Sequence, residues 1–206
     1  MMKVLTAALV LALPAAAGAQ QPDTGTFSVL QGDAAIATET FSRTADRLET
    51  TLEITNQATL VTRSDLAADA TIRRMEIEVY GPGGEGEPIE TSAATFAGEG
   101  VTLEQPIGTV VTEEPQPAEQ GSIPYVNPSP SYMEQILRRA RAIGGDEVRV
   151  GIWMPGQPIA ETSVVAFDDG AATINLAGIV IEATTDAEGR LLGATIPAQG
   201  VTIIRE

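Results

Sequence analysis

The sequence predicts a mainly β fold with one helix: a strongly curved antiparallel meander, or half-barrel, packed around a single α-helix at about 129–143. Short runs of alternating apolar and polar residues, typical of strands, fill most of the chain. Only one stretch has the periodicity of an amphipathic helix. Tight turns rather than helices separate the short runs, which excludes βαβ units and a parallel sheet.

The first 19 residues have the pattern of a secretory signal peptide. Lys3 precedes a ten-residue apolar segment at 4–13, and Ala17-Gly18-Ala19 forms a small-residue cleavage site. Ten apolar residues are too few to cross a bilayer as a helix, and no later stretch is long enough. We therefore expect cleavage after Ala19, a single β-rich domain at 20–206, a periplasmic or extracellular location, and no membrane span after cleavage.

The first half of the mature chain predicts a meander. In 47–56, Leu48, Thr50, Leu52 and Ile54 alternate with polar residues, which indicates a strand with one wet face. The Gly- and Pro-rich segment 81–88 and the polar segment 113–121 are predicted loops. The other predicted strands of this half lie at 26–31, 34–43, 58–65, 72–80 and, less regularly, 89–96, 101–103 and 107–112.

The segment 129–145 carries the helix pattern. Ser131 and Glu134 have the spacing of a capping box at its start, and Gly144 supplies a residue that ends helices. The arginines at 138, 139 and 141 are interpreted as a solvated face, with Glu134 paired to Arg138, although they also suit an anionic head group or partner. The predicted apolar face consists of Met133, Ile136, Leu137, Ala140 and Ile143.

A second meander follows the helix. Strands are predicted at 148–154, 159–167, 171–176, 179–184, 190–196 and 201–205, with turns at 168–170, 177–178, 186–189 and 198–200.

Charge and composition exclude several classes of protein. After cleavage, eleven arginines face 28 carboxylates, a net charge of −17 spread along the chain. This argues against nucleic acid and anionic membranes as partners, because both need clustered cations. The chain has no cysteine, so disulfides are absent.

The mature chain also lacks histidine and lysine. Ser-His-Asp and Cys-His catalysis, Schiff-base chemistry and the common zinc sites therefore have no residues to use. We expect no enzyme activity, no cofactor and no metal. The carboxylates leave two alternatives: a pair of acids that hydrolyses a glycoside, and a calcium ion bound at 168–170 or 186–189. Neither turn matches a calcium loop, and acidic residues before glycine suit tight turns.

The main functional hypothesis is an exported, non-enzymatic domain that binds an apolar or amphiphilic, lipid-like ligand between sheet and helix. Tyr132 and Trp153 are expected near the rim of such a site. The competing interpretation is that these side chains fill the core. Further alternatives are a module that offers an edge strand or the loops 81–88 and 113–121 to an envelope protein, and a carboxylate-based hydrolase. The candidate ligand-binding residues are Tyr132, Met133, Ile136, Leu137, Ala140, Trp153 and Met154.

Two blocks carry a resemblance to known proteins: FSVLQGDAAIATETF at 27–41 and TTDAEGRLLGATIPAQGVTIIRE at 184–206. With the signal peptide, they resemble secreted bacterial β-rich domains of unknown function, which are similar in architecture to LolA-type periplasmic lipoprotein carriers. The resemblance implies a half-barrel with one helix and favours a lipid or other apolar ligand. It supplies no catalytic motif.

Overall fold

The computed structural model describes residues 21–111, 115–154 and 161–206, so the predicted signal peptide at 1–19 lies outside the described residues. One α-helix, α1 (Pro130–Ile143), and one short 3₁₀ turn, η1 (Pro197–Gln199), accompany the strands. The strands are β1 (Asp23–Gln31), β2 (Ala34–Arg43), β3 (Arg47–Ile54), β4 (Ala58–Leu66), β5 (Ile72–Tyr80), β6 (Glu90–Ala97), β7 (Gly100–Glu104), β8 (Gln116–Pro117), β9 (Ile123–Pro124), β10 (Glu147–Trp153), β11 (Glu161–Asp168), β12 (Ala171–Leu176), β13 (Ile179–Thr185), β14 (Leu191–Ile196) and β15 (Val201–Arg205).

Within the described residues, the strands form one curved sheet in the order β8-β7-β6-β5-β4-β3-β2-β1-β15-β14-β13-β12-β11-β10-β9. All neighbours are antiparallel except the short β9–β10 pair. The first and last strands meet in the middle of the sheet, where Phe27 is opposite Arg205 and Gln31 is opposite Val201. The sheet is not closed into a barrel, and the predicted fold class is confirmed.

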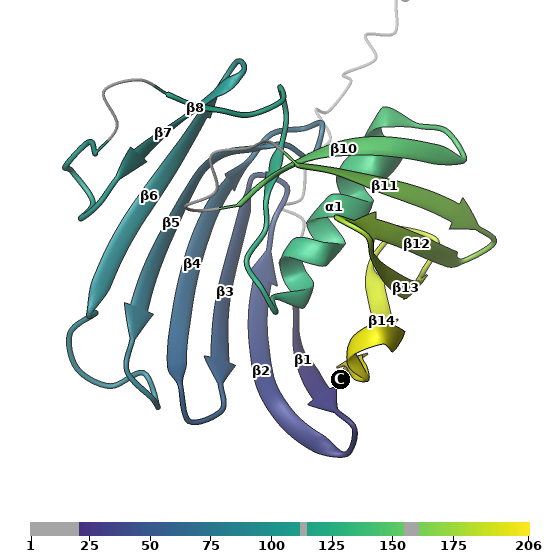
Figure 1. The fold of residues 1–206 in the computed structure, drawn as a ribbon, viewed down its shortest axis with the longest axis horizontal. Coiled ribbons are helices and arrows are strands. Elements are labelled where there is room, and N and C mark those ends of the chain that lie inside the picture. The colour runs from purple at the N-terminus through teal and green to yellow at the C-terminus, as the bar shows by residue number, and fades with distance from the viewer. Residues whose placement is uncertain (1–20, 112–114, 155–160) are drawn as a thin grey trace, which may run out of the picture.

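The sheet forms two arms that curve around α1 (Figure 1). One arm holds β1 to β8, and the other holds β9 to β15. The helix packs chiefly against β2, β9, β10 and β14, so it lies close to the second arm and to the start of the first. Much of the inner side of β3 to β7 faces the viewer in Figure 1 without a helix in front of it.

The alternation predicted for the first meander is confirmed most clearly in β3. Leu48, Thr50 and Leu52 are buried, whereas Glu49 and Glu53 are exposed. The strand predicted at 107–112 is wrong in its described part, which makes only an isolated bridge from Val110 to Glu104. Residues 112–114 and 155–160, which contain parts of other predicted elements, lie outside the described residues.

The helix forms where it was predicted, but its start differs from the prediction. Ser129 is the N-cap residue and Pro130 the first helical residue, a position that suits proline because its missing N–H has no helical partner there. The capping box of Ser131 and Glu134 is wrong, because Glu134 binds arginines instead. At the other end, the Gly144 N–H donates to the Ala140 carbonyl at 3.0 Å, as the predicted stop requires.

The carboxylate of Glu39 on β2 takes the place of the capping box. Its Oε2 accepts the Ser131 N–H at 2.8 Å and its Oε1 accepts the Ser129 hydroxyl at 2.5 Å. A negative group at this position also interacts favourably with the positive end of the helix dipole. The first turn of α1 is thus attached to the first arm of the sheet.

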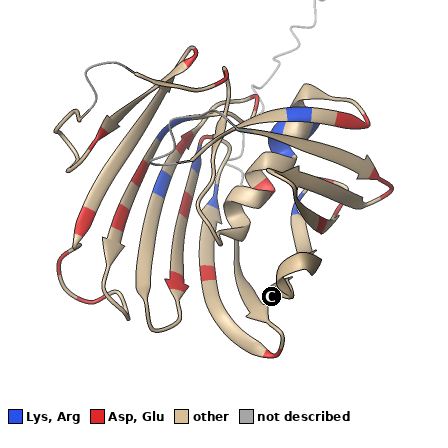
Figure 2. Cartoon of the chain, viewed as in Figure 1, with Lys and Arg blue, Asp and Glu red and all other residues tan. Residues whose placement is uncertain are grey.

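Charged residues are unevenly distributed over the fold. Figure 2 shows acidic residues on both arms, whereas the basic residues gather in the upper half of the view, around α1 and the nearby strand ends. Among the described residues, no helix has the length and apolar character that a membrane span requires.

Candidate functional site

Six of the seven predicted ligand-binding side chains are buried in the core between sheet and helix. Met133, Ile136, Leu137 and Ala140 form the inward face of α1 and are at most 1% exposed. Ile143, which the periodicity placed on the same face, is 47% exposed because it lies in the last turn, beyond the sheet. These positions agree with the competing interpretation that the helix stripe fills the core.

The expected rim positions of Tyr132 and Trp153 are wrong, because both side chains are buried. The Tyr132 hydroxyl lies 2.8 Å from the Ser64 hydroxyl and 3.1 Å from that of Thr62, so a polar group is accommodated in the interior. This burial raises the pKa of Tyr132 to about 12. Trp153 packs edge-on against Phe96, with ring centroids 5.5 Å apart. Of the seven residues, only Met154 is half-buried.

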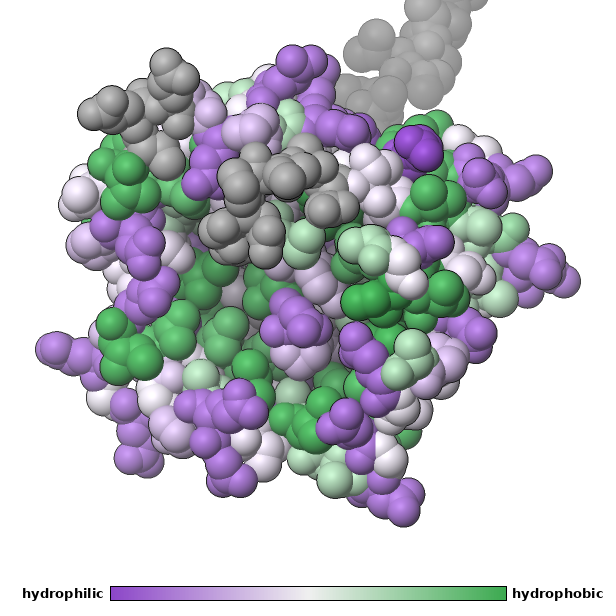
Figure 3. All heavy atoms as spheres, in the orientation of Figure 1, coloured by the Kyte–Doolittle hydropathy of each residue, from purple (hydrophilic) through white to green (hydrophobic). Residues whose placement is uncertain are grey.

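The open apolar surface lies instead on the inner side of β3 to β7. We call this surface the inner apolar face. Figure 3 shows hydrophobic residues gathered in the middle of the side that corresponds to the view of Figure 1. Each residue of the inner apolar face is half-buried. They are Ile54, Leu60, Ile77, Val79 and Leu103.

Strand register places these side chains together. Leu60 on β4 is opposite Leu52 on β3 and opposite Val79 on β5, so all three point to the inner side. Ile77 lies two positions before Val79 and therefore on the same side. Ala94 on β6 is opposite the buried Met75 on β5 and opposite Leu103 on β7, so Leu103 also points to the inner side.

The half-buried Tyr125 directly follows β9, a strand that contacts β5. Its N–H donates to the Trp153 carbonyl at 2.9 Å, which continues the β9–β10 pairing and fixes the segment beside β10. Burial raises the pKa of Tyr125 to about 12. The phenol is therefore neutral at physiological pH, and the inner apolar face gains no charge from it.

The geometry explains why this face is open. A helix of 14 residues is about 21 Å long and about 10 Å wide. The eight strands β1 to β8, at a spacing of about 4.8 Å, make an arm roughly 34 Å wide. One helix next to β2 and β10 therefore leaves the outer strands of the arm uncovered. The number and length of the predicted strands would have indicated this from the sequence, but the prediction considered only the helix stripe.

A polar network lies on the opposite side of α1 from the inner apolar face and centres on the buried carboxylate of Glu134. Its Oε1 lies 2.8 Å from Nε of Arg138 and 3.3 Å from Nε of Arg43. Its Oε2 lies 3.2 Å from Nη1 of Arg205 and accepts the Leu191 N–H at 2.9 Å. This carboxylate therefore joins the helix to β2, β14 and β15.

Two further groups complete the network. Asp23 accepts from Nη2 of Arg205 at 2.7 Å and lies 3.7 Å from Nη2 of Arg138. Gln135 accepts from Arg43. Burial lowers the pKa of Arg43 to about 10, and Glu134 opposes this shift, so the guanidinium stays charged at neutral pH. The predicted pairing of Glu134 with Arg138 is confirmed, but its assignment to a solvated face is wrong for Glu134, which is buried.

Glu39 and Asp186 bear on the two carboxylate hypotheses, glycoside hydrolysis and calcium binding. Burial raises the pKa of Glu39, as a general acid requires, but its side chain has no exposed surface for a substrate to reach. Asp186 accepts the backbone N–H groups of Glu188 and Arg190, which makes 186–189 a turn held by its own carboxylate. No group of three or more potential metal ligands occurs among the residues that the structure describes.

The fold resembles two solved structures. One is a DUF1089 family protein from Pseudomonas aeruginosa, with a TM-score of 0.57 and 16% identity over 96% of this chain and 97% of that chain. The other is a β-barrel-like protein of domain of unknown function DUF1849 from Brucella abortus, with a TM-score of 0.52 and 12% identity over 90% of this chain and 95% of that chain. No family model and no curated protein matches the sequence. At these identities the likeness establishes the fold, a β-rich, barrel-like domain. The similarity to lipoprotein carriers stays a prediction.

Proposed function

We propose that the mature chain is a non-enzymatic binding domain that holds an apolar or amphiphilic small molecule on the inner apolar face. The observation that carries this proposal is the group of half-buried aliphatic side chains on the concave side of β3 to β7, which α1 leaves uncovered. Soluble domains that present a concave apolar surface commonly use it for binding. This site replaces the one first predicted between helix and sheet.

The setting of the proposed site is the periplasm or the exterior of the cell. The apolar segment 4–13 and the small residues at 17–19 support export. The absence of histidine, cysteine and lysine from the mature chain supports binding rather than catalysis.

The test uses an uncharged probe, N-phenyl-1-naphthylamine, whose fluorescence rises in apolar surroundings. Wild-type protein should bind it with a saturable signal. Ile77→Asp places a charge on the inner apolar face and should weaken binding at least tenfold, which corresponds to about 1.4 kcal/mol. Leu192→Asp is the matched control, because Leu192 is 45% exposed on β14, in the other arm.

Either of two results would overturn the proposal: no saturable signal with wild-type protein, or equal weakening by the two variants. Urea unfolding of each variant establishes that it is folded before binding is measured. The variant Leu60→Asp, on the neighbouring strand β4, gives a second test that does not depend on whether position 77 accepts a charged residue.

A second candidate function is protein binding at the outer end of the first arm. Ile89 is 75% exposed, Val110 is 60% exposed and Val111 is 49% exposed. They lie near a 270 Å³ cavity between 88–91 and 105–106. A photo-crosslinking residue at Ile89 should capture one envelope protein if this surface docks a partner, whereas the same residue at Leu192 should not. Equal capture at both positions, or none, would reject this function.

A further inference from the structure

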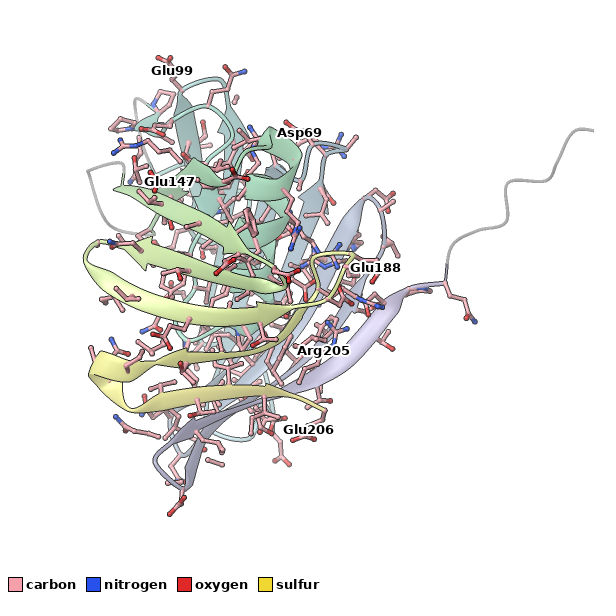
Figure 4. All side chains as sticks on the ribbon, turned by 90° about the vertical axis from the view of Figure 1, so that its right-hand side faces the viewer. Asp69, Glu99, Glu147, Glu188, Arg205 and Glu206 are labelled. Carbon is pink, nitrogen blue, oxygen red and sulfur yellow. The ribbon has the colours of Figure 1, made fainter. Side chains whose placement is uncertain are left out.

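A second site lies on the other side of α1, where two adjoining cavities meet the arginines of the helix. One cavity, of 280 Å³, lies between the β2–β3 turn, the β4–β5 turn and the last turns of α1. The other, of 310 Å³, lies between the β2–β3 turn, the start of β1 and the β13–β14 turn. Arg43, Arg138 and Glu188 line both cavities. Figure 4 looks onto this side of the molecule, with Glu188 and Arg205 labelled and Asp69 above them.

Arginines gather around these two cavities. Four arginines line them, at 43, 138, 141 and 190, against two carboxylates, Asp23 and Glu188. Both carboxylates already have partners: Arg205 donates to Asp23 at 2.7 Å, and Arg190 donates to Glu188 at 3.3 Å. Three of the lining arginines are paired outside the cavity lining, Arg43 and Arg138 with Glu134 and Arg190 with Asp186. Arg141 is the lining arginine for which no such pair occurs within the described residues, so its charge is available to attract an anion.

Arg141 is held in place without a carboxylate. Its guanidinium lies 4.6 Å from the centre of the Phe167 ring, and its Nη2 donates to the Thr185 hydroxyl at 3.1 Å. Its side chain crosses Gly189, where a Cβ atom would lie 2.7 Å from Cδ of Arg141. Within the described residues, no carboxylate oxygen lies within 4.0 Å of it. A cation that is positioned but not neutralised is suited to bind an external anion.

Arg138 lies three residues before Arg141, on the same side of the helix. Within the described residues, the hydrogen bond of its side chain is the one from Nε to Glu134 at 2.8 Å. Its Nη2 lies 3.7 Å from Asp23, beyond hydrogen-bond distance, so the Nη groups keep donors available. The planar fork of an arginine matches carboxylate and phosphate oxygens. The wall opposite is apolar and consists of Leu66, Ala67, Ala68 and Ala70.

We propose that these cavities bind a small organic anion, in which a carboxylate or phosphate group contacts Arg138 and Arg141 and a short apolar part lies against the β4–β5 turn. This site is separate from the inner apolar face and does not depend on it. Glu134 binds Nε of Arg138 but does not neutralise Arg141, because its oxygens are occupied by Arg43, Arg138, Arg205 and the Leu191 N–H.

The test is isothermal titration of the mature protein with butyl phosphate, butyrate and butanol in about 50 mM salt. At least one of the two anions should bind, the stronger of them identifies the head group, and butanol should give no heat of binding. Arg141→Gln should weaken anion binding at least tenfold. Arg149→Gln is the matched control, because this substitution removes the same charge. Arg149 is exposed on β10 and lines neither cavity. The control substitution should change the affinity less than twofold.

Three results would overturn the proposal: no binding of either anion, binding of butanol as strong as that of the anions, or equal weakening by the two arginine variants, which would indicate general charge attraction. Backbone amide NMR provides a readout that needs no variant. Addition of the stronger anion should shift the resonances of residues 44–45 and 67–70, and shifts confined to other regions would reject the site. The probe of the inner apolar face is uncharged, so the two proposals can fail independently.

Discussion

Replacement of Glu134 by glutamine should destabilise the fold more than the loss of any surface ion pair. Glu134 is 1% exposed, and the arginines around it, Arg43 and Arg205, are 6% and 14% exposed. Glu134→Gln removes the charge that compensates these buried cations and turns an N–H donor toward them. The loss of one partner from a buried ion pair costs about 3–5 kcal/mol. For a domain of this size, the melting temperature should fall by roughly 6–20 °C.

Urea unfolding of the mature protein at pH 7, followed by Trp153 fluorescence, measures this loss. Glu49→Gln is the matched control, because Glu49 lies 2.8 Å from Arg47 but both side chains are about half exposed, at 50% and 48%. Its loss should stay below about 1 kcal/mol. If the two variants lose equal free energy of unfolding, the buried network does not hold α1 to the sheet and our reasoning is wrong.

Three further predictions concern other parts of the fold. Burial raises the pKa of Glu39, so protonation of Glu39 favours the folded state at low pH, and this contribution to stability is lost as the pH rises. Glu39→Gln should therefore gain stability relative to wild type between pH 4 and pH 7, by at most about 1.4 kcal/mol per pH unit. A stability difference that does not vary with pH would contradict this. Gly151→Ala should lower the free energy of unfolding by about 1–3 kcal/mol, because the added Cβ lies 2.5 Å from Oγ of Ser122, the residue before β9. Gly81→Ala, with no atom within 4 Å of its Cβ, should stay within about 0.5 kcal/mol in the same urea assay, and similar losses would reject the steric argument. Tyr132→Phe should cost about 1–2 kcal/mol in thermal unfolding, since it removes the hydroxyl that bonds two buried hydroxyls on β4, and an unchanged melting temperature would show that these bonds contribute nothing.

The sequence predicts the local elements of this fold because their signals are short-range. The alternation in β3 depends on neighbours two positions apart, and the stripe of α1 on neighbours three and four apart. Both were predicted at nearly the observed bounds. The curved sheet around one helix follows from the order of these elements and was also predicted.

The contacts that join distant elements could not be predicted in this way. The cap of α1 comes from Glu39, 92 positions before Ser131, whereas the sequence offered a nearer carboxylate, Glu134, at the standard spacing. Glu134 is instead held by Arg43 on β2 and Arg205 on β15, strands that come to lie on either side of β1 only when the sheet has formed. A polar residue on a helix gives no sign from the sequence alone that its partners are buried with it.

The candidate site was misplaced for a related reason. The helix stripe is the strongest apolar pattern in the chain, and it is strong because it fills the core. The inner apolar face is formed by single residues from several strands, such as Leu60 and Ile77, whose pattern resembles that of buried strand positions. Only the strand register and the limited length of α1 distinguish the residues of the inner apolar face from buried strand residues.

The pairing of β1 with β15 has a consequence for the protein while it is being made. About 170 residues separate Gln31 from Arg205, so β1 has β2 on one side but no neighbour on its other side until the last strand emerges. At the usual 5–20 residues per second, this interval lasts roughly 9 to 35 s. During that time a strand edge with unpaired N–H and C=O groups is available to other chains. A chaperone that covers residues 23–31 of the nascent chain would protect the protein over this interval.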